Sequence, residues 1–171
     1  PAADTVPALV AAGAICLIAG PGGRRQVPVE QVTTGPGQTS LQNGEFVVAF
    51  QFPKKPPRSG DAYLRFIPRT EMDIAVVGAG VNLTLDQSGI CQQARVSLGA
   101  VAPTVLLVET AANALVGSRI DNEALDKLEA AASAACNPID DKRGTVEFRV
   151  DVAGVLAKRA ALIAKKRAEV N

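Results

Sequence analysis

The stretch DIAVVGAGVNLTLD, residues Asp73–Asp86, decides between two folds. Its β-type residues lead into Gly78-Ala79-Gly80, as the first strand and turn of a dinucleotide-binding fold do. That fingerprint requires a third glycine three residues after the second, but Leu83 stands there. The residues after Gly80 alternate between apolar and polar, which is typical of a strand and not of a helix. We therefore predict one long strand, whose glycines permit a bend or close packing, and no Rossmann site.

The composition is that of an ordinary globular protein. Of 171 residues, 47% are hydrophobic and 20% charged, with a net charge of +1. A chain of this length can bury a core in one or two small domains. The near-neutral balance argues against a nucleic-acid-binding protein, and no apolar run approaches the roughly 18 residues of a membrane span. We find no pattern of a signal peptide, so nothing suggests secretion. Together with the reduced state expected for its cysteines, this predicts a cytoplasmic protein.

The chain has no histidine and three cysteines. The lack of histidine removes His-based triads and His-liganded metal sites. Cys16, Cys91 and Cys136 lie far apart in apolar stretches and form no CxxC pair. We expect reduced, packed thiols rather than a disulfide or a metal site. Because an iron–sulfur cluster normally needs four thiolates, we expect none to be held by this chain alone.

The first 57 residues predict one helix and three strands. A helix is expected to start near Val6, with Asp4 or Thr5 as its cap and Pro7 in its first turn. The predicted strands are residues 14–20, 24–30 and 45–52, with a turn at 20–23 and a long polar loop at 33–44. Since the chain opens abruptly at Pro1, we expect it to be a piece of something longer.

A linker and a second domain are predicted to follow. PKKPPRSGD, residues 53–61, is rich in proline, so it resists both helix and sheet, and we place a domain boundary there. Strands are expected in residues 62–69, 73–86 and 93–102, and helices in residues 107–116, 122–136 and 145–170. The start of the last segment, VEFRVDV, also alternates like a strand. The predicted class is α+β, not an alternating α/β repeat.

Several blocks, read in order, resemble one known family. They are PAADTVPALVAAGA, GGRRQVPVEQVTTGPGQTSLQNGEFV, YLRFIPRTEMDIAVVGAGVNLTLD, ARVSLGAVAPTVLLVETAANALVG and NPIDDKRGTVEFRVDVAGVLAKRA. Together they resemble the FAD-binding medium subunit of molybdenum hydroxylases, as in carbon monoxide dehydrogenase and xanthine dehydrogenase. The match covers nearly the whole chain. It is specific for the family but says nothing about the substrate.

The resemblance implies a fold and a function. Residues 1–57 would be the incomplete C-terminal part of the FAD-binding domain. Residues 58–171 would be the C-terminal domain, a small antiparallel sheet packed against three helices. The family's two glycine-rich loops for the FAD pyrophosphate would precede Pro1. The family's FAD relays electrons from the iron–sulfur clusters of a partner subunit to an external acceptor, which makes the chain part of an oxidoreductase. The implied partners are a large molybdenum-cofactor subunit and a small 2Fe–2S subunit.

Three positions match FAD contacts of the family: Asp4, Val47 and Arg65. Arg65 stands where some members have a lysine, so the charge is kept but the donor is planar and broader. Each position also has a purely structural interpretation. Asp4 would cap a helix, Val47 would fill the core, and Arg65 would be a solvated strand residue. No catalytic residue and no metal ligand is predicted, and this fragment alone is expected to hold FAD weakly or not at all.

Two further features have plain explanations. The basic run at Lys158, Arg159 and 165–167 is expected to be a solvated helix end, where cations complement the helix dipole. Asp140-Asp141 is followed by Lys142 and Arg143, which indicates local charge balance rather than a metal pair. The alternative function, a non-catalytic module for subunit docking or scaffolding, stays open. By the resemblance, the substrate chemistry would belong to the large molybdenum subunit.

Overall fold

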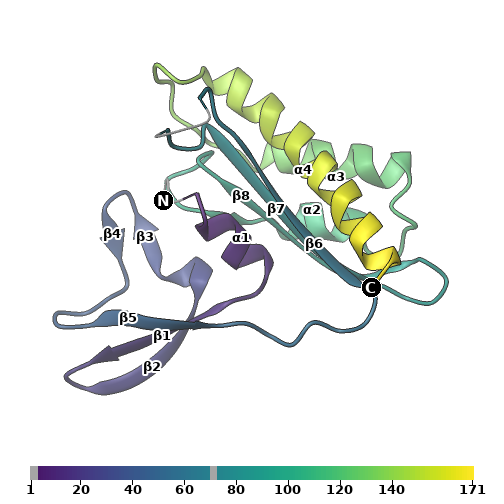
Figure 1. Cartoon of the computed structure of the whole chain (residues 1–171). Coiled ribbons are helices and arrows are strands. Elements are labelled where there is room, and N and C mark those ends of the chain that lie inside the picture. The colour runs from purple at the N-terminus through teal and green to yellow at the C-terminus, as the bar shows by residue number, and fades with distance from the viewer. Residues whose placement is uncertain (1–3, 70–72) are drawn as a thin grey trace.

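The computed structural model describes residues 4–69 and 73–171 (Figure 1). Within them the strands form three antiparallel sheets, in the orders β2-β1-β5, β3-β4 and β6-β7-β8-β9. The elements in chain order are α1 Val6–Ala11, β1 Ile15–Gly20, β2 Gly23–Pro28, the 3-10 turn η1 Val29–Gln31, β3 Thr33–Gly35, β4 Gln38–Thr39, β5 Phe46–Gln51, β6 Ser59–Phe66, β7 Val77–Leu85, β8 Cys91–Gly99, β9 Leu106–Leu107, α2 Glu109–Leu115, α3 Asn122–Ala134 and α4 Val146–Glu169. The predicted α+β class is confirmed.

The stretch around Gly78 and Gly80 is one long strand, as predicted. Strand β7 pairs antiparallel with β6 on one side and with β8 on the other, so this is not the parallel sheet of a dinucleotide-binding fold. A Cβ at Gly80 would lie 2.7 Å from Ser97 Oγ and 3.0 Å from Ala11 Cβ. Glycine is needed at this position because helix α1 packs directly on the strand.

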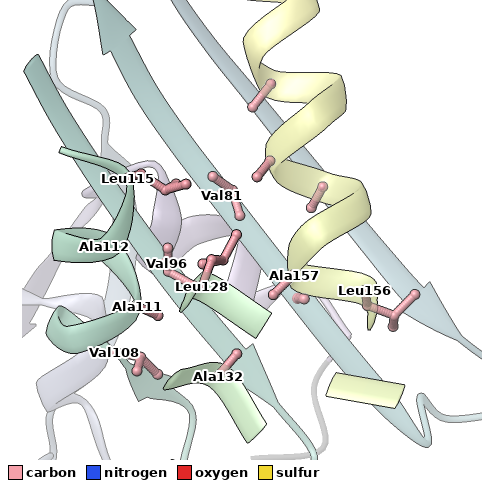
Figure 2. Packing of buried hydrophobic residues seen from close by; sticks show 14 of the residues in the cluster. Val81, Val96, Val108, Ala111, Ala112, Leu115, Leu128, Ala132, Leu156 and Ala157 are labelled. Atoms are coloured by element: carbon pink, nitrogen blue, oxygen red, sulfur yellow. The ribbon is translucent and has the colours of Figure 1, made fainter. Parts of the chain in front are cut away.

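The main core lies between one face of the four-stranded sheet and three helices (Figure 2). Helix α4 packs on β6 and β7, α2 packs on β8, and α3 packs against α2 and α4. The three-helix cover implied by the resemblance is therefore present. Fully buried members of this core include Val81, Val96, Leu98, Leu115, Leu128 and Ala157.

Helix α1 covers the opposite face of the same sheet and separates it from the β2-β1-β5 sheet (Figure 1). Its Val10 belongs to a second, smaller core with Cys16 and Ile18 of β1. Ser97 Oγ donates a hydrogen bond of 2.6 Å to the Pro7 carbonyl. The Arg95 guanidinium donates two hydrogen bonds, of 2.9 and 3.1 Å, to the Val10 carbonyl. Polar contacts from β8 thus fix both ends of α1.

The ends of α2, α3 and α4 carry ordinary helix-capping signals, whereas α1 begins after Thr5 without a side-chain cap. The Asp121 carboxylate accepts a 3.0 Å hydrogen bond from the Ala124 amide and caps α3. Thr145 caps α4 in the same way through the Phe148 amide. Gly117, two residues beyond the end of α2, has a positive φ of 80°, as expected where glycine ends a helix.

The prediction of a loop over residues 33–44 is wrong in part, because this segment contains the short hairpin β3-β4. Gly37 at its tip has a φ of 68°, which glycine adopts without strain. The pairing joins Thr33 to Thr39 and Gly35 to Gln38. Such polar residues carry no apolar alternation, so periodicity gave no sign of the hairpin.

Helix α4 presents a different face to the sheet than its large apolar residues suggest. Its start is helical and not a strand, but Phe148, Val155 and Leu162 are 40%, 36% and 46% exposed. The buried face consists mainly of small residues: Ala153, Gly154, Ala157, Ala160, Ala161, Ala164 and Ala168. Small side chains let the helix approach the sheet closely, which explains why bulkier residues face outward.

The basic run of α4 is not simply solvated. Lys158 Nζ forms ion pairs with Asp126 at 2.7 Å and Glu129 at 3.0 Å, both on α3. Arg167 donates a 2.6 Å hydrogen bond to the Asp61 carbonyl. These contacts fasten α4 to α3 and to β6. Among the described helices, none is long and apolar enough to cross a membrane.

The three cysteines are unbridged thiols. Cys16 and Cys91 are buried and Cys136 is half-buried. Burial raises the pKa of Cys91 and of Cys136 to about 11 and also raises the pKa of Cys16. These groups therefore stay protonated at neutral pH, which suits packing and not nucleophilic chemistry.

Gly60→Ala is predicted to destabilise the protein by about 3 kcal/mol. A Cβ at Gly60 would collide with the Ala164 carbonyl and lie 2.6 Å from the Ala168 amide, both part of the α4 backbone. Backbone atoms cannot swing aside as a side-chain end can, so α4 would have to move. Urea unfolding of the wild type and the variant measures the difference.

Gly22→Ala is the matched control. Gly22 is exposed in the β1-β2 turn, and a Cβ there meets nothing within 4 Å. We expect its unfolding free energy to stay within about 0.5 kcal/mol of the wild type. Equal losses in both variants would contradict the packing argument.

Candidate functional site

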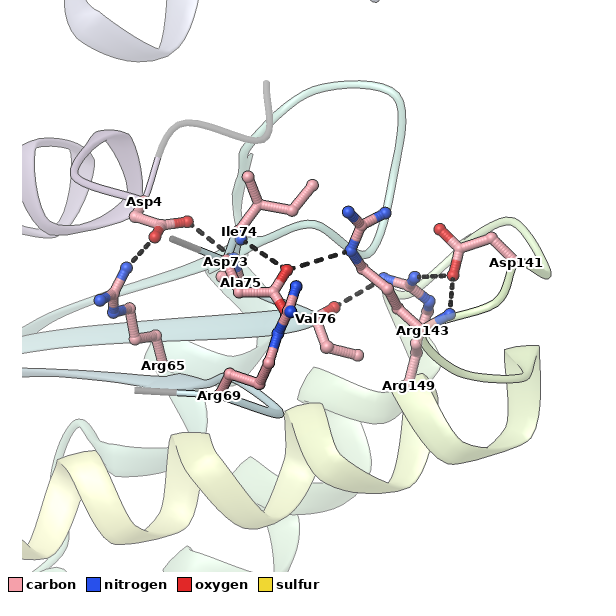
Figure 3. A network of polar contacts seen from close by, with 10 residues as sticks. All are labelled: Asp4, Arg65, Arg69, Asp73, Ile74, Ala75, Val76, Asp141, Arg143 and Arg149. Atoms are coloured by element: carbon pink, nitrogen blue, oxygen red, sulfur yellow. Dashed lines mark hydrogen bonds and ion pairs between the residues drawn. The ribbon is translucent and has the colours of Figure 1, made fainter. Parts of the chain in front are cut away.

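Asp4 and Arg65 are 61 residues apart in the sequence, and the fold brings them together (Figure 3). Asp4 lies two residues before the start of α1, and its side chain does not cap that helix, whose N-cap is Thr5. Instead Asp4 Oδ1 accepts a 2.9 Å hydrogen bond from the Ala75 amide, and Oδ2 forms an ion pair with Arg65 Nη1. The capping interpretation of Asp4 is therefore wrong, and so is that of Arg65 as a merely solvated residue.

Arg65 lies on β6 directly opposite Gly78 of β7. Alternation along β6 places Tyr63 on the same face, which is the face that α1 covers. The Tyr63 hydroxyl lies over Gly78 and would be 2.7 Å from a Cβ there. It is buried, has no hydrogen-bond partner among the described residues, and burial raises its pKa to about 12. Gly78 thus leaves room for a buried hydroxyl beside Arg65.

Val47 is held separately from this pair. It lies on β5 opposite Ile18, at the open edge of the β2-β1-β5 sheet, and is half-buried against the core around Val10. A packing role is therefore real, as the core interpretation predicted. The polar contacts of Asp4 and Arg65 are with each other and with the Ala75 amide, and none of them reaches Val47. The structure brings two of the three predicted site residues together and leaves the third on the neighbouring sheet.

An ion pair fixes the chain where it enters β5. The Arg25 guanidinium donates to both carboxylate oxygens of Glu45, at 2.8 and 2.7 Å, and also to the Ser40 carbonyl. Glu45 accepts a further 2.7 Å hydrogen bond from the Gln42 amide. Arg25, followed by this amide, lowers the pKa of Glu45 to about 2. Val47 lies two residues after Glu45, so the position of its backbone depends on the Arg25–Glu45 ion pair.

A second network holds the segment that leads into β7 (Figure 3). The Asp73 carboxylate is almost buried and forms ion pairs with Arg69 at 3.3 Å and Arg143 at 3.4 Å. Burial alone would raise the pKa of Asp73, but the hydrogen bonds from these two arginines lower it overall. Since Ala75 donates to Asp4, Asp73 helps to position the amide that orients the Asp4 carboxylate.

Arg149 is the buried member of this network, at 4% exposure. Its guanidinium donates hydrogen bonds of 2.7 Å to the Val76 carbonyl and 3.2 Å to the Ala100 carbonyl. It also forms an ion pair with Asp141 at 2.6 Å. Asp141 is therefore balanced by a helix arginine as well as by its own loop, where its carboxylate accepts from the Arg143 amide. These hydrogen bonds, from the Arg143 amide first and then from Arg149, lower the pKa of Asp141. No sequence motif marked Arg149, since its partners are mainly backbone carbonyls.

A cavity of about 270 Å³ opens beside the network. Its lining is mostly apolar and includes Ile74, Ala75, Ala102, Pro103, Pro138 and Ile139. The charged groups at its wall are already paired, Asp141 with Arg149 and Arg143 with Asp73, and Asn137 adds an amide. This cavity offers apolar contact but no free acid or base.

The chemistry of the site is that of binding. Asp4 offers a fixed carboxylate acceptor, Arg65 a cation that is more than a third exposed, and Tyr63 an unpartnered hydroxyl. No pair of these groups is arranged as a nucleophile with its base. Within residues 4–69 and 73–171, no three His, Cys, Asp or Glu side chains gather as a metal site would require. The arrangement can bind a polar ligand through hydrogen bonds and charge.

Comparisons with known sequences cover almost the whole chain. The sequence model of the CO dehydrogenase flavoprotein C-terminal domain matches residues 62–164. The model of the FAD binding domain in molybdopterin dehydrogenase matches residues 1–55. The carbon monoxide dehydrogenase medium chain of Afipia carboxidovorans is 38% identical over 97% of this chain and 57% of its own length. A xanthine dehydrogenase FAD-binding subunit of Escherichia coli O157:H7 is 29% identical over 81% of this chain and 48% of its own.

Solved structures agree with this similarity. A reconstituted CO dehydrogenase from Oligotropha carboxidovorans matches with a TM-score of 0.92 and 36% identity, over 98% of this chain and 58% of that one. Quinoline 2-oxidoreductase from Pseudomonas putida 86 matches with a TM-score of 0.86 and 28% identity, again over 98% of this chain and 57% of the other. The chain spans about half the length of the relatives it matches.

Asp4→Ala is predicted to expose the Ala75 amide, whereas Asp4→Asn is predicted to keep it protected. Alanine removes the acceptor of the 2.9 Å hydrogen bond, while asparagine retains a carbonyl oxygen and loses only the ion pair with Arg65. Loss of one hydrogen bond of about 1 kcal/mol should speed local exchange roughly fivefold. Hydrogen exchange measured by NMR at Ala75 tests this, and equal rates in both variants would contradict the assignment.

Glu45→Gln is predicted to remove an acid-dependent part of the stability. Glu45 has a pKa of about 2 in the fold, below the value of about 4.3 in unfolded chains. Its depressed pKa therefore stabilises the fold fully above about pH 5, and this contribution is lost as the pH falls from about 4.5 to 2.

The difference in urea midpoint between wild type and Glu45→Gln should therefore be large at neutral pH and shrink toward pH 2. Glu147→Gln on the exposed first turn of α4 is the control, because Glu147 forms no ion pair with the described residues. A midpoint difference for Glu45→Gln that stays constant across this range would show that the pair with Arg25 does not perturb Glu45.

Proposed function

Because the chain belongs to the family of FAD-binding medium subunits of molybdenum hydroxylases, we propose an electron-relaying role for it. We propose that it is part of a flavoprotein subunit. In this role FAD takes electrons from iron–sulfur clusters of a partner subunit and passes them to an external acceptor. The observation that carries the proposal is the pairing of Asp4 with Arg65. Two residues implied at the flavin by the resemblance meet in space although they are far apart in sequence.

We divide the chain into two functional parts. Residues 1–57 contribute to the FAD-binding domain, and residues 58–171 form the C-terminal domain of the subunit. The larger core, around Val81 and Leu128, lies within residues 58–171. The smaller core, around Val10 and Ile18, is built mainly by the first part but also takes in Val105 of the second. Helix α1 belongs to the first part by sequence but packs on β7 and β8 of the second. It therefore holds the two parts in a fixed relation at the proposed site.

Asp4, Arg65 and the backbone of Val47 would hold the cofactor, and their chemistry fits it. FAD supplies the redox chemistry when bound, while the protein binds it, orients it and tunes its potential. The Asp4 carboxylate accepts hydrogen bonds from N–H or O–H groups, and the Arg65 guanidinium donates to carbonyl or phosphate oxygens. The Tyr63 hydroxyl beside Arg65 is unpartnered among the described residues but buried over Gly78, so it lines the site and offers no exposed donor. Asp4 is already oriented by the Ala75 amide.

The pyrophosphate is the part of FAD that these residues do not serve. The glycine-rich turn Gly20–Gly23 joins β1 to β2 as a hairpin and does not open a helix, so it offers no anion-binding helix end. Strand β5 also exposes Phe46, Phe50 and, just beyond its end, Phe52, at 60%, 46% and 56%. The relatives are about twice as long as the matched region. We propose that further residues of a complete subunit cover β5 and bind the pyrophosphate, and that this chain alone holds FAD weakly.

The proposed assembly follows the family. A large subunit with the molybdenum cofactor and a small subunit with 2Fe–2S clusters would be the partners, in the cytoplasm. By analogy with the family, the substrate chemistry would reside in the large subunit. The cytoplasmic proposal agrees with three unbridged thiols.

The chain is predicted to elute from gel filtration without flavin absorbance after incubation with FAD. In a fluorescence titration with FAD, weak binding should remain, and Asp4→Ala should lower the affinity about tenfold, since a hydrogen bond to a charged group contributes roughly 1.5 kcal/mol. Asp126→Ala, which removes a carboxylate from α3 on the other face of the sheet, should leave the affinity unchanged.

The outcomes separate the two parts of the proposal. Stoichiometric flavin after gel filtration would show that the chain needs no further residues for FAD. Equal FAD affinity of Asp4→Ala and Asp126→Ala would remove Asp4 from the site. An intact enzyme complex that contains this chain but no FAD would favour the docking or scaffold function instead.

A further inference from the structure

The outward face of α4 carries an apolar stripe that the core does not explain. Phe148, Val155 and Leu162 are spaced seven residues apart, which places them on one side of the helix. They are 40%, 36% and 46% exposed, on the side opposite to the alanine face that packs on the sheet. We name these three residues the outer stripe. Phe66 of β6 extends it, since its ring packs edge-on against Phe148 at 5.6 Å.

Two opposite charges flank the outer stripe symmetrically. Asp151 lies four residues before Val155 and Arg159 lies four residues after it. Neither forms an ion pair with the residues that the structure describes, although Lys158 next to Arg159 is engaged by Asp126 and Glu129. Phe148 and Leu162 are likewise seven residues before and after Val155. The pattern is therefore self-complementary about Val155. Asp151 on one side corresponds to Arg159 on the other, and Phe148 corresponds to Leu162.

We infer that the outer stripe binds a second copy of this chain, with the two α4 helices antiparallel and Val155 at the two-fold axis. In this arrangement Phe148 of each copy lies against Leu162 of the other, and Asp151 of each lies against Arg159 of the other. A two-fold interface requires this reciprocity, because residue i must contact j while j contacts i. Antiparallel helices that cross at a small angle keep such a stripe in contact over several turns.

Charge selects this occupant over others. A parallel pair of α4 helices would place Asp151 beside Asp151 and Arg159 beside Arg159, which is repulsive. An anionic membrane surface would meet Asp151 and Glu147 together with the basic residues, so it would gain little. The antiparallel second copy is the arrangement in which Asp151 and Arg159, the two flanking charges without an ion pair among the described residues, each meet the opposite charge.

The interface is small, so the dimer is weak. From Phe148 to Leu162 the helix rises about 21 Å, at 1.5 Å per residue. One helix pair of this length buries less than the roughly 800 Å² per partner of standard interfaces. We therefore expect association in the micromolar range or above, visible as a concentration-dependent increase in mass.

Disulfide trapping of the whole chain tests the two-fold axis directly. Val155→Cys should form a cross-linked dimer under mild oxidation, because only a residue on the axis meets its own copy within disulfide distance. Val146→Cys is the matched control, with 37% exposure at the first residue of the same helix, and it should stay monomeric. The three native cysteines are buried or half-buried, so the unmodified chain should not cross-link. Equal trapping at both positions would overturn the inference.

Charge reversal tests the register. In sedimentation equilibrium, Asp151→Arg and Arg159→Asp should each weaken the dimer about tenfold or more, while the double variant should restore it. Asp140→Arg, on the exposed loop before α4, is the charge-matched control and should leave association unchanged. A chain that is monomeric at every concentration would overturn the inference and assign the stripe to a different subunit. Single variants that are not rescued by the double variant would exclude the antiparallel register.

Discussion

The close seat of α1 on β7 is the constraint on which the rest depends. At Gly80 the strand has no side chain, so the Pro7 carbonyl and Ala11 come within 3.0 Å of where a Cβ would be. Ser97 and Arg95 then hydrogen-bond to carbonyls at the two ends of the helix. A helix fixed in this way places Asp4, just before its first turn, beside Arg65 and the Ala75 amide. The same helix sends Val10 into the other core. One glycine contact thus joins the two sheets and assembles the proposed site.

A scarcity of large side chains determines how helices α3 and α4 pack on the four-stranded sheet and on each other. The sequence has no tryptophan and only 4% aromatic residues, so close packing depends on alanine and glycine. Gly60 lies against the backbone of α4, and Gly154 lies against Ser133 and Glu129 of α3. When helices approach this closely, a large residue facing the sheet would have no room. The bulky residues of α4 are consequently displaced to its outer side, where they form the outer stripe.

Much of the fold could be predicted from local signals, because caps, turns and alternation act over a few residues. The Asp121 cap, the turn at Gly20–Gly23 and the long strand through Gly78 are of this kind. The buried face of α4 could not be predicted, since periodicity ranks residues by hydrophobicity and here volume decides which face fits. The β3-β4 hairpin, built from polar residues, gave no periodic signal.

For the site, the resemblance to a known family pointed to Asp4 and Arg65. Their ion pair and the support from Asp73 and Arg149 depend on contacts between distant segments, which spacing does not encode.

Arginine at position 65 changes what the pair with Asp4 can do. A lysine presents a single ammonium point charge, whereas a guanidinium carries five N–H donors in a rigid plane. Arg65 uses Nη1 on Asp4 Oδ2, so its other donors remain available to a ligand. Asp4 in turn is held by the Ala75 amide through Oδ1, so its carboxylate is oriented before any ligand arrives. Preorganisation of this kind reduces the ordering cost of binding. At the proposed FAD site, Arg65 would therefore keep the positive charge and add a fixed geometry, which would tie the orientation of the cofactor to the position of β6 on β7.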